Sequence, residues 1–244
     1  MSVTTTQLKN PPPTPPANWR LLAGLIIFAI MTLIVGELGE HIANGAPLTL
    51  TDIRLSAWLE ANRTPGLTTV FRIATELGST WWAISSAVVF GLYLISRRRF
   101  YWLATVWLSV FGGMLLNVQL KSIFQRVRPS FSNPVLSLTG YSFPSGHTMA
   151  ATVLYTVLAA YLLTHVRRRP ARLLIVLVAV FLIAAVGFSR IYLGAHYLTD
   201  VLGAIAEGLA WVTLCLVTLL SDWRQYNRKL HAATGRFRTR GQKL

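Results

Sequence analysis

The sequence is poor in cysteine, in acidic residues and, over long stretches, in charge of any kind. The single cysteine, Cys215, excludes an intrachain disulfide and a cysteine-based metal site, and its apolar neighbours indicate a packing residue. Only 8 of the 244 residues are Asp or Glu, and the loops hold no carboxylate cluster of the kind that Mg²⁺ or Ca²⁺ requires. We therefore expect no metal ion and no other cofactor.

Charge is absent from apolar runs such as 21–35 and 173–187. With their flanks these runs approach the ~20 residues that a membrane span demands. The chain is thus predicted to be an integral membrane protein, all-α, with six transmembrane helices. The predicted segments are 20–37, 79–96, 101–119, 147–166, 171–188 and 198–220.

Three regions are expected along the chain: a disordered proline-rich tail (1–18), a transmembrane domain (19–221) and a basic cytoplasmic tail (222–244). An alternative is that the first apolar segment is a signal peptide, because Ala43 and Gly45 resemble a small-residue cleavage site. Their distance from the apolar run favours a retained helix.

The outer loop 38–78 is the only long loop between predicted spans. Leu55, Trp58 and Leu59 recur there at helical spacing, and Thr64-Pro65 breaks the pattern. Two short amphipathic helices are therefore expected. They would either lie on the membrane surface or pack over the helix bundle.

The net charge of +15 is compatible with nucleic-acid binding, but its distribution argues against it. Blocks of arginine at 97–99 and 167–169 separate apolar runs, and further basic residues fill the C-terminal tail. This is the pattern of cytoplasmic loops. With both termini cytoplasmic, most of the 23 Lys and Arg residues fall inside, and we expect the motifs described next on the extracytoplasmic face.

The segment 189–200 places His196 and Asp200 four residues apart at the start of the last apolar stretch. On a helix the two would share a face. A carboxylate that accepts from one imidazole nitrogen leaves the other nitrogen free as a nucleophile. With Arg190 beside them, this favours catalysis over a merely structural hydrogen bond.

A second motif, Pro144-Ser145-Gly146-His147, stands directly before an apolar helix. Free backbone N–H groups at a helix start bind anions, and glycine lets a phosphate approach the backbone closely. His147 would stand at the helix mouth and protonate a leaving oxygen.

The third motif closes the third apolar segment with Lys121 and Arg128-Pro129. Two fixed cations neutralise the charge of a transferring phosphoryl group. A basic cluster that binds lipid head groups is the alternative, and for Arg126 it is the role that we expect.

Taken together, Lys-x6-Arg-Pro, Pro-Ser-Gly-His and Ser-Arg-x5-His-x3-Asp resemble the three signatures of the type 2 phosphatidic acid phosphatase superfamily. The resemblance covers roughly residues 20 to 220. It implies that His196 forms a phosphohistidine, Asp200 holds its ring and His147 handles protons. It also implies that no metal is needed. The residues that would hold the phosphoryl oxygens are Lys121, Arg128, Ser145, Gly146 and Arg190.

The resemblance further implies hydrolysis of a lipid phosphate; the extracytoplasmic site favours a substrate in the outer leaflet, and the compact size and short loops suggest a bacterial inner membrane. The substrates expected are undecaprenyl diphosphate, which we prefer at this point, phosphatidylglycerophosphate and phosphatidic acid. Alternatives are a phosphotransferase, a non-catalytic lipid-binding or transport protein, and a haloperoxidase. Glu207, deeper in the last segment, is expected to make a structural polar contact, with substrate or proton handling as the other reading.

Overall fold

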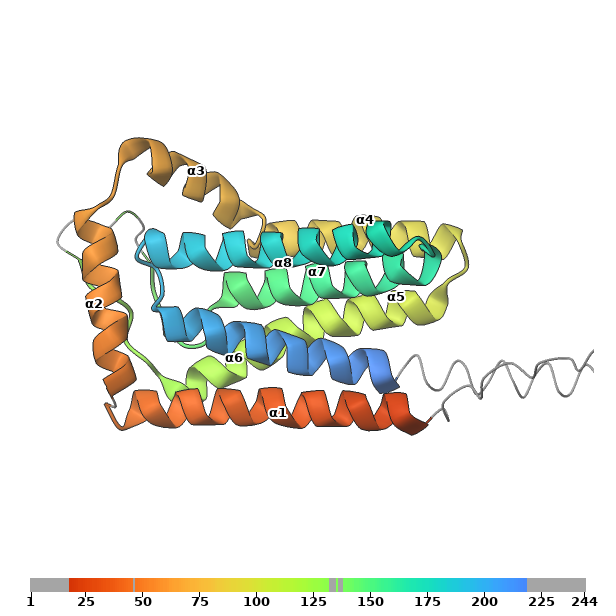
Figure 1. The fold of residues 1–244 in the computed structure, drawn as a ribbon, viewed down its shortest axis with the longest axis horizontal. Helices are drawn as coiled ribbons and strands as arrows, with labels where there is room; N and C mark the ends of the chain where they lie inside the picture. Colours follow the sequence, from red (N-terminus) through yellow and green to blue (C-terminus); the bar gives the residue numbers. More distant parts are fainter. Residues whose placement is uncertain (1–17, 46, 132–134, 136–137, 219–244) are drawn as a thin grey trace, which may run out of the picture.

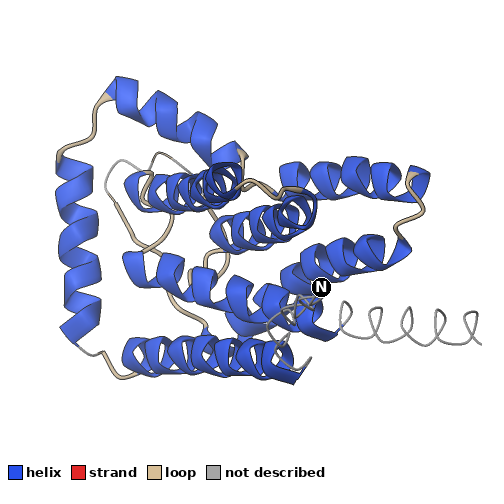
Figure 2. Cartoon of the chain, turned by 45° about the vertical axis from the view of Figure 1, so that its right-hand side comes forward, coloured by secondary structure: helices blue, strands red, loops and turns tan. Residues whose placement is uncertain are grey.

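The computed structural model describes residues 18–45, 47–131, 135 and 138–218, and within these residues every regular element is a helix (Figure 1, Figure 2). Most of the expected lead-in (1–18) and the whole basic tail (222–244) lie outside the described residues. The labelled helices are α1 (Asn18–Ala43), α2 (Pro47–Ala61), α3 (Pro65–Glu76), α4 (Thr80–Ser96), α5 (Phe100–Trp107), η1 (Leu108–Gly112), α6 (Gly113–Phe124), α7 (Gly146–His165) and α8 (Arg169–Tyr192). A final helix, Leu198–Thr218, follows.

Five of these helical segments are long and apolar enough to cross a membrane, and the pair α3 and α4 passes the same test together with a bend of 42°. The described chain therefore has five or six candidate spans. α4 and α7 match the predicted spans 79–96 and 147–166 to within one residue, whereas α1 extends six residues beyond the predicted end at 37 and α8 four residues beyond 188. The third predicted span, 101–119, is α5, η1 and α6 in unbroken succession.

The core of the bundle forms around α7, which packs against α4, α5, α6 and α8. Half of the helix is buried, including Met149, Val153 and Val157. Alanine residues of α4, Ala83 and Ala87, are fully buried against this core and allow close helix approach. By contrast α1 and α8 expose most of their apolar side chains, as a lipid-facing helix would.

A π-turn, η1, interrupts the span between α5 and α6. A π-turn holds an extra residue and disturbs the helical hydrogen bonds. The indole N–H of Trp211, on the final helix, donates to the carbonyl oxygens of Leu108 and Ser109, each at 3.1 Å. A side chain placed on Gly112 would meet Trp211 at 2.5 Å, so the close approach requires glycine there.

The two short helices expected in the outer loop are present as α2 and α3. Thr64 caps α3, accepting from the Leu67 N–H at 3.4 Å, and Pro65 opens the first turn. α2 crosses one end of the bundle and α3 packs along α8 (Figure 1). α2 buries Asp52 and Leu59 while Trp58 on its other side is exposed, so packing over the bundle is the arrangement that the structure shows.

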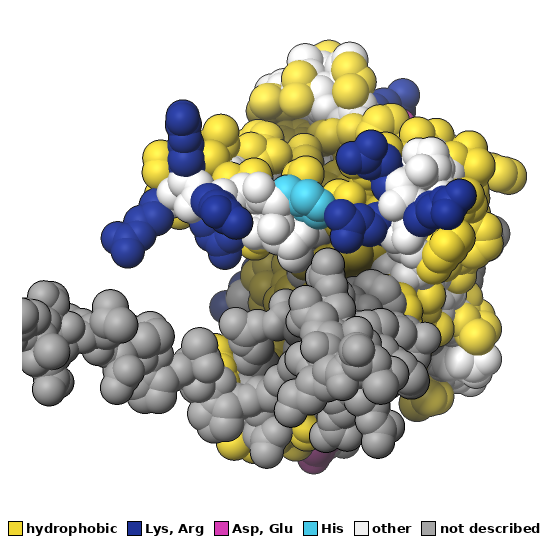
Figure 3. Space-filling model, turned by 90° about the vertical axis from the view of Figure 1, so that its right-hand side faces the viewer, with side chains coloured by type: hydrophobic (Ala, Val, Ile, Leu, Met, Phe, Trp, Pro, Cys, Tyr) yellow, Lys and Arg dark blue, Asp and Glu magenta, His cyan; other side chains and the backbone are white. Residues whose placement is uncertain are grey.

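Basic loops gather at the opposite end of the bundle from α2. The α4–α5 connection carries Arg97, Arg98 and Arg99, and the α7–α8 connection carries Arg167 and Arg168; all five are exposed. Figure 3 looks onto this end, where Lys and Arg side chains cluster. The bundle thus has one cationic end, and the three sequence motifs lie at the other.

Candidate active site

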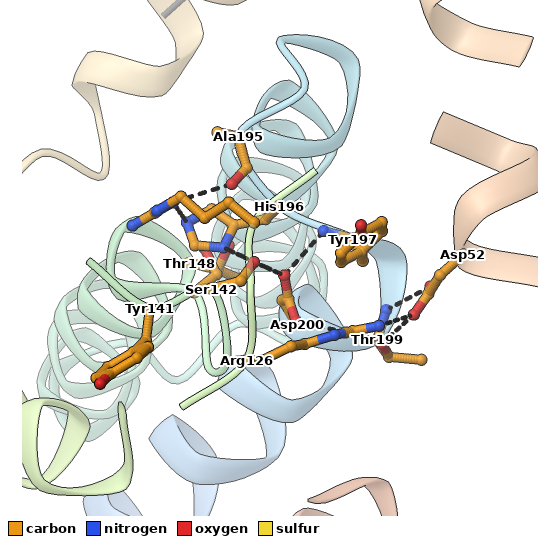
Figure 4. A network of polar contacts seen from close by, with 12 residues as sticks. Asp52, Arg126, Tyr141, Ser142, Thr148, Ala195, His196, Tyr197, Thr199 and Asp200 are labelled. Carbon is orange, nitrogen blue, oxygen red and sulfur yellow. Dashed lines mark hydrogen bonds and ion pairs between the residues drawn. The ribbon is translucent and has the colours of Figure 1, made fainter. Parts of the chain in front are cut away.

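The three sequence motifs meet at the end of the bundle that α2 crosses (Figure 4). The C-terminal end of α6 supplies the first, the segment that opens α7 supplies the second, and the turn between α8 and the final helix supplies the third. Direct contacts join His196, Asp200 and Arg128, and backbone contacts tie Lys121 and Ser145 to the same cluster.

His196 lies in a turn, and this corrects the expectation that it shares a helix face with Asp200. The turn opens at Gly194, whose φ of +72° favours glycine. The backbone N–H groups of Ala195 and His196 both donate to the carbonyl oxygen of Arg190, at 2.9 and 3.2 Å. The final helix begins only at Leu198, so Asp200 stands in its first turn and reaches back to the imidazole.

Asp200 also caps its own helix. One carboxylate oxygen, Oδ2, accepts the backbone N–H of Tyr197 at 2.9 Å, as the third residue of a helix does in a capping box. The same oxygen lies 3.4 Å from His196 Nδ1 and accepts the hydroxyl of Ser142. The local helix start therefore fixes the carboxylate that faces the histidine.

The two nitrogens of the His196 ring have different neighbours. Nδ1 faces the Asp200 carboxylate, while Nε2 lies 3.2 Å from the Arg128 guanidinium. Assigning the proton to Nδ1 satisfies both contacts, because Nδ1–H then faces Asp200 Oδ2 and Ser142 Oγ, each at 3.4 Å, and Nε2 accepts from Arg128. Nε2 is consequently the nitrogen that carries a lone pair toward the cations.

Burial of His196 lowers the pKa of its ring to about 4, although Asp200 acts in the opposite direction. Arg190 and Arg128 lower the pKa of His196 further by repelling an imidazolium. Burial also lowers the pKa of Arg128, against the pull of Asp200. At neutral pH the imidazole is therefore uncharged, the form that a nucleophile requires.

Backbone carbonyl oxygens orient the two cations of the first motif. Lys121 Nζ donates to Tyr141 O at 2.9 Å and to Ser142 O at 3.3 Å. Arg128 donates from Nε to Gly140 O at 3.0 Å and from Nη1 to Ala195 O at 2.9 Å. Because carbonyl groups carry no net charge, both cations keep their charge for an anion.

α7 begins within the second motif. Ser145 is the N-cap, and Gly146 is the first helical residue, so Pro144 precedes the cap. Ser145 is fully buried; its N–H donates to Asp200 O at 3.1 Å, and its Oγ accepts from the Thr148 hydroxyl at 3.0 Å. The first N–H groups of a helix have no partner within it and are suited to an anion.

His147 is partly exposed in the first turn of α7, and its side chain makes no hydrogen bond to any residue that the structure describes. Its backbone carbonyl lies so close to Gly78 that a side chain there would approach within 2.7 Å. The connection between α3 and α4 therefore packs directly on the turn that carries this histidine.

Arg190 is 3% exposed and donates from Nη1 to Thr75 Oγ1 at 2.8 Å. Its Nε is buried and has no hydrogen-bond partner among the described residues. An unpaired buried donor is costly, and a phosphoryl oxygen would satisfy it. This orphan donor fits the phosphate-binding role expected for Arg190.

Arg126 is placed differently from the expectation of a head-group contact at the membrane surface. It is 7% exposed and donates to Asp200 Oδ1 at 2.6 Å and to Asp52 Oδ2 at 2.8 Å. It also donates to the Thr199 hydroxyl at 2.6 Å, and its guanidinium lies 4.2 Å from the Tyr197 ring centre. A buried guanidinium held by two carboxylates is an internal bridge.

Sequence reasoning missed Asp52, Ser142 and Thr199. For Asp52 a signal was present, because it falls three residues before Leu55 and seven before Leu59, on the apolar face of α2. An acidic residue on such a face needs a partner. Ser142 and Thr199 carry no such signal.

Glu207 has the structural partner that the sequence could not name. Asn117 Nδ2, on α6, donates to Glu207 Oε2 at 2.8 Å, one helical turn before Lys121. The other oxygen, Oε1, is buried without a partner among the described residues. The expected polar contact is therefore present beneath the site.

A histidine–aspartate pair among fixed cations, at one end of an all-helical apolar bundle, is the arrangement expected of a membrane enzyme that acts on an anionic group. A sequence model of the PAP2 superfamily matches residues 102–224. The chain belongs to this superfamily and is a lipid phosphatase.

Named relatives agree with this assignment. Phosphatidylglycerophosphatase B of Bacillus subtilis is 37% identical over 149 residues, which cover 60% of this chain and 72% of that protein. Phosphatidylglycerophosphatase B of Haemophilus influenzae is 45% identical over 75 residues, 30% of each chain.

Solved structures share the fold. A transmembrane PAP2-type phosphatidylglycerolphosphate phosphatase from Bacillus subtilis matches with a TM-score of 0.66 and 27% identity, over 84% of this chain and 96% of that one. Aquifex aeolicus LpxE matches with a TM-score of 0.55 and 24% identity, over 68% and 94%, and shows the fold alone.

Proposed function

We propose that this protein hydrolyses the terminal phosphate monoester of a membrane phospholipid, with phosphatidylglycerophosphate as the preferred substrate, through a phosphohistidine on His196. The observation that carries the proposal is the double pairing of His196, with Asp200 at Nδ1 and Arg128 at Nε2. That pairing prepares a neutral nucleophile next to a cation that binds its target.

In the first step Nε2 attacks phosphorus, and the bond from phosphorus to the lipid oxygen breaks. His147, protonated when the phosphate dianion is bound beside it, gives this proton to the departing alkoxide and becomes neutral. The imidazolium that forms keeps its proton on Nδ1, directed toward Asp200. The negative charge of Asp200 stabilises this imidazolium. Charge on the phosphoryl oxygens is met by Lys121, Arg128 and Arg190.

In the second step His147 takes a proton from water, and the oxygen attacks the phosphohistidine. The phosphorus–nitrogen bond breaks, inorganic phosphate leaves and His196 returns to its neutral form. Each proton given in the first step is regained in the second, so the cycle consumes only lipid phosphate and water.

The names of the relatives support this order of substrates. The two curated relatives are named phosphatidylglycerophosphatases, and one of them matches along 72% of its length. Undecaprenyl diphosphate, which the sequence alone favoured, stays an untested prediction and becomes the second substrate to assay. Phosphatidic acid is the third.

We further infer that six helices span the bacterial inner membrane, with α4 of the bent pair α3 and α4 as the second span, and that the site faces the periplasm. The support is the separation of charge: the arginine loops at 97–99 and 167–169 lie at the end of the bundle away from His196 (Figure 1, Figure 3). Cytoplasmic loops carry such an excess of arginine. Substrate would enter from the outer leaflet with its tails still in the bilayer.

The test is phosphate release from the three lipids by purified protein in detergent, with His196→Ala beside it. His165→Ala is the matched control, because His165 is exposed in the last turn of α7, far from the motifs. Release that is lost only in the His196 variant supports the proposal. Transfer of labelled phosphate to another lipid without free phosphate would indicate a phosphotransferase, and equal release by the His196 variant would exclude the mechanism.

A further inference from the structure

Arg126 lies on the side of Asp200 that faces away from His196. Asp200 presents Oδ2 to the imidazole, to Ser142 and to the Tyr197 N–H, and presents Oδ1 to Arg126 Nη1 at 2.6 Å (Figure 4). The two oxygens of one carboxylate are thus divided between the reacting histidine and a buried cation. No signature position of the superfamily quoted above includes Arg126.

Asp52 binds Nη2, the guanidinium nitrogen of Arg126 that does not contact Asp200. It accepts from Arg126 Nη2 at 2.8 Å, from the Thr199 N–H at 3.1 Å and from the Thr199 hydroxyl. The Thr199 N–H belongs to the first turn of the final helix, which has no internal acceptor for it. Asp52 therefore caps the helix that carries Asp200, although it comes from α2, about 150 residues earlier in the sequence.

Every charge in this arrangement has an opposite charge beside it only when all three side chains are present. A buried arginine between two buried carboxylates is compensated, whereas removal of one member leaves an uncompensated charge. Arg126 is 7% exposed, Asp52 2% and Asp200 0%, so water does not replace a missing partner easily. The buried ion pairs of Asp200 with Arg126, and of Arg126 with Asp52, therefore hold Asp200 in the orientation that turns Oδ2 toward His196.

We propose that Arg126 and Asp52 are positioning residues for phosphoryl transfer, acting through Asp200, and that α2 is thereby an integral part of the catalytic site. The inference rests on the proposed function. Arg126 binds Asp200 at Oδ1, the oxygen that faces away from His196, and Asp52 binds Arg126 and Thr199, so both side chains act on the histidine only through Asp200. Their loss should therefore lower kcat and leave KM nearly unchanged.

The experiment compares Arg126→Gln, Arg126→Lys, Asp52→Asn and the double variant Arg126→Gln/Asp52→Asn in detergent. Arg54→Gln is the matched control, because Arg54 is exposed on α2 two residues after Asp52. For each protein, kcat, KM and thermal stability are measured on the lipid that the wild type hydrolyses best.

We expect Arg126→Gln and Asp52→Asn each to lower kcat by roughly 10-fold to 100-fold, with KM changed less than about twofold, as for groups that orient a catalytic residue. The double variant should lose no more than the worse single variant, because both act through one contact. Arg126→Lys keeps the charge and should recover part of the rate.

A second measurement separates positioning from mere structural support. Besides Asp200, the charged groups around His196 are Arg128 from the segment after α6, Arg190 from α8, and His147 from α7. Removing Arg126 frees Asp200 to stabilise the imidazolium, so the acid limb of kcat/KM should move to higher pH, by roughly half a unit or more. Lower stability alone does not shift that limb.

Wild-type rate and pH profile in Arg126→Gln, or a rise in KM without loss of kcat, would overturn the inference while leaving the proposed function intact. A loss of kcat that Arg54→Gln shares would also overturn it. If the wild type releases no phosphate, or His196→Ala releases as much, the proposed function fails first and this inference fails with it.

Discussion

The guanidinium of Arg190 donates from Nη1 to the hydroxyl of Thr75 at 2.8 Å, which joins the end of α8 to the last turn of α3. Arg190 has one further buried donor, Nε, and no partner for it within the described chain. Thr75 thus orients the guanidinium of Arg190, and the buried Nε–H of that group is available to a phosphoryl oxygen.

Replacing Thr75 by Val should weaken phosphate binding. The two side chains have nearly the same shape, and the change removes the hydroxyl that accepts from Arg190 Nη1. We expect KM to rise about 3-fold to 10-fold, equivalent to roughly 1 kcal/mol, the usual value of one hydrogen bond. Thr69→Val, an exposed change on the same helix, is the control; a KM unchanged in Thr75→Val would show that Thr75 does not orient Arg190.

Replacing Asp200 by Asn should abolish most of the rate while leaving the lipid bound. The amide cannot stabilise the imidazolium and favours the wrong tautomer, a change that costs about 10⁴ in kcat in the serine protease triad. We expect a loss of at least about 10³-fold in kcat. Lipid binding, measured by equilibrium titration, should persist, and a variant with more than a tenth of the wild-type kcat would contradict the role of Asp200.

The acid limb of kcat/KM should lie near pH 4. Burial lowers the pKa of His196 to about 4, and only the neutral imidazole attacks phosphorus. Activity is therefore retained as pH falls through 6.5, where an ordinary histidine gains its proton, and is lost only as pH falls through the lowered pKa. Initial rates between pH 3.5 and 8 at low substrate check this, and a limb near pH 6.5 would refute it.

Phosphate release should survive EDTA. The expected nucleophile is a histidine and the expected electrophilic groups are Lys121, Arg128 and Arg190, so every step has a side chain that performs it. Rates in excess EDTA should equal those without it. Loss of activity that added Mg²⁺ restores would contradict the metal-independent mechanism.

Gly78→Ala should lower kcat through a steric effect. A Cβ on Gly78 would lie 2.7 Å from the His147 carbonyl and 2.5 Å from Val186 Cγ1, so the first turn of α7 must move. Overpacking of this kind costs about 1–3 kcal/mol of stability. Gly66→Ala, with no atom within 4 Å, is the control and should leave kcat and thermal stability nearly unchanged.

Local patterns were sufficient to predict the apolar segments and the meeting of the motifs. Hydrophobic runs define helices without reference to any partner. Placing Lys121, Ser145 and His196 together required only that each motif stand at the same end of its span. Thr64-Pro65 likewise marked the start of α3 from local chemistry.

Contacts between residues that lie far apart in the sequence could not be predicted from local patterns. Arg126 lies within a basic segment that is typical of a membrane surface. Its burial follows from contacts with Asp52 and Asp200, each 74 positions away in the sequence. The same holds for Asn117 and Glu207, which lie 90 positions apart. His196 was misplaced for a different reason: a four-residue spacing suits both a helix face and a turn that leads into a helix.

The π-turn between α5 and α6 has a consequence for how this sequence can vary. One additional residue rotates everything after it by about 100° relative to an uninterrupted helix. Asn117 and Lys121 owe their angular phase to that residue, and Trp211 stabilises it from the helix that also carries Asp200. A single-residue deletion within 108–112 would therefore swing Lys121 away from the site, whereas the same deletion in a basic loop at the far end would not disturb this phase.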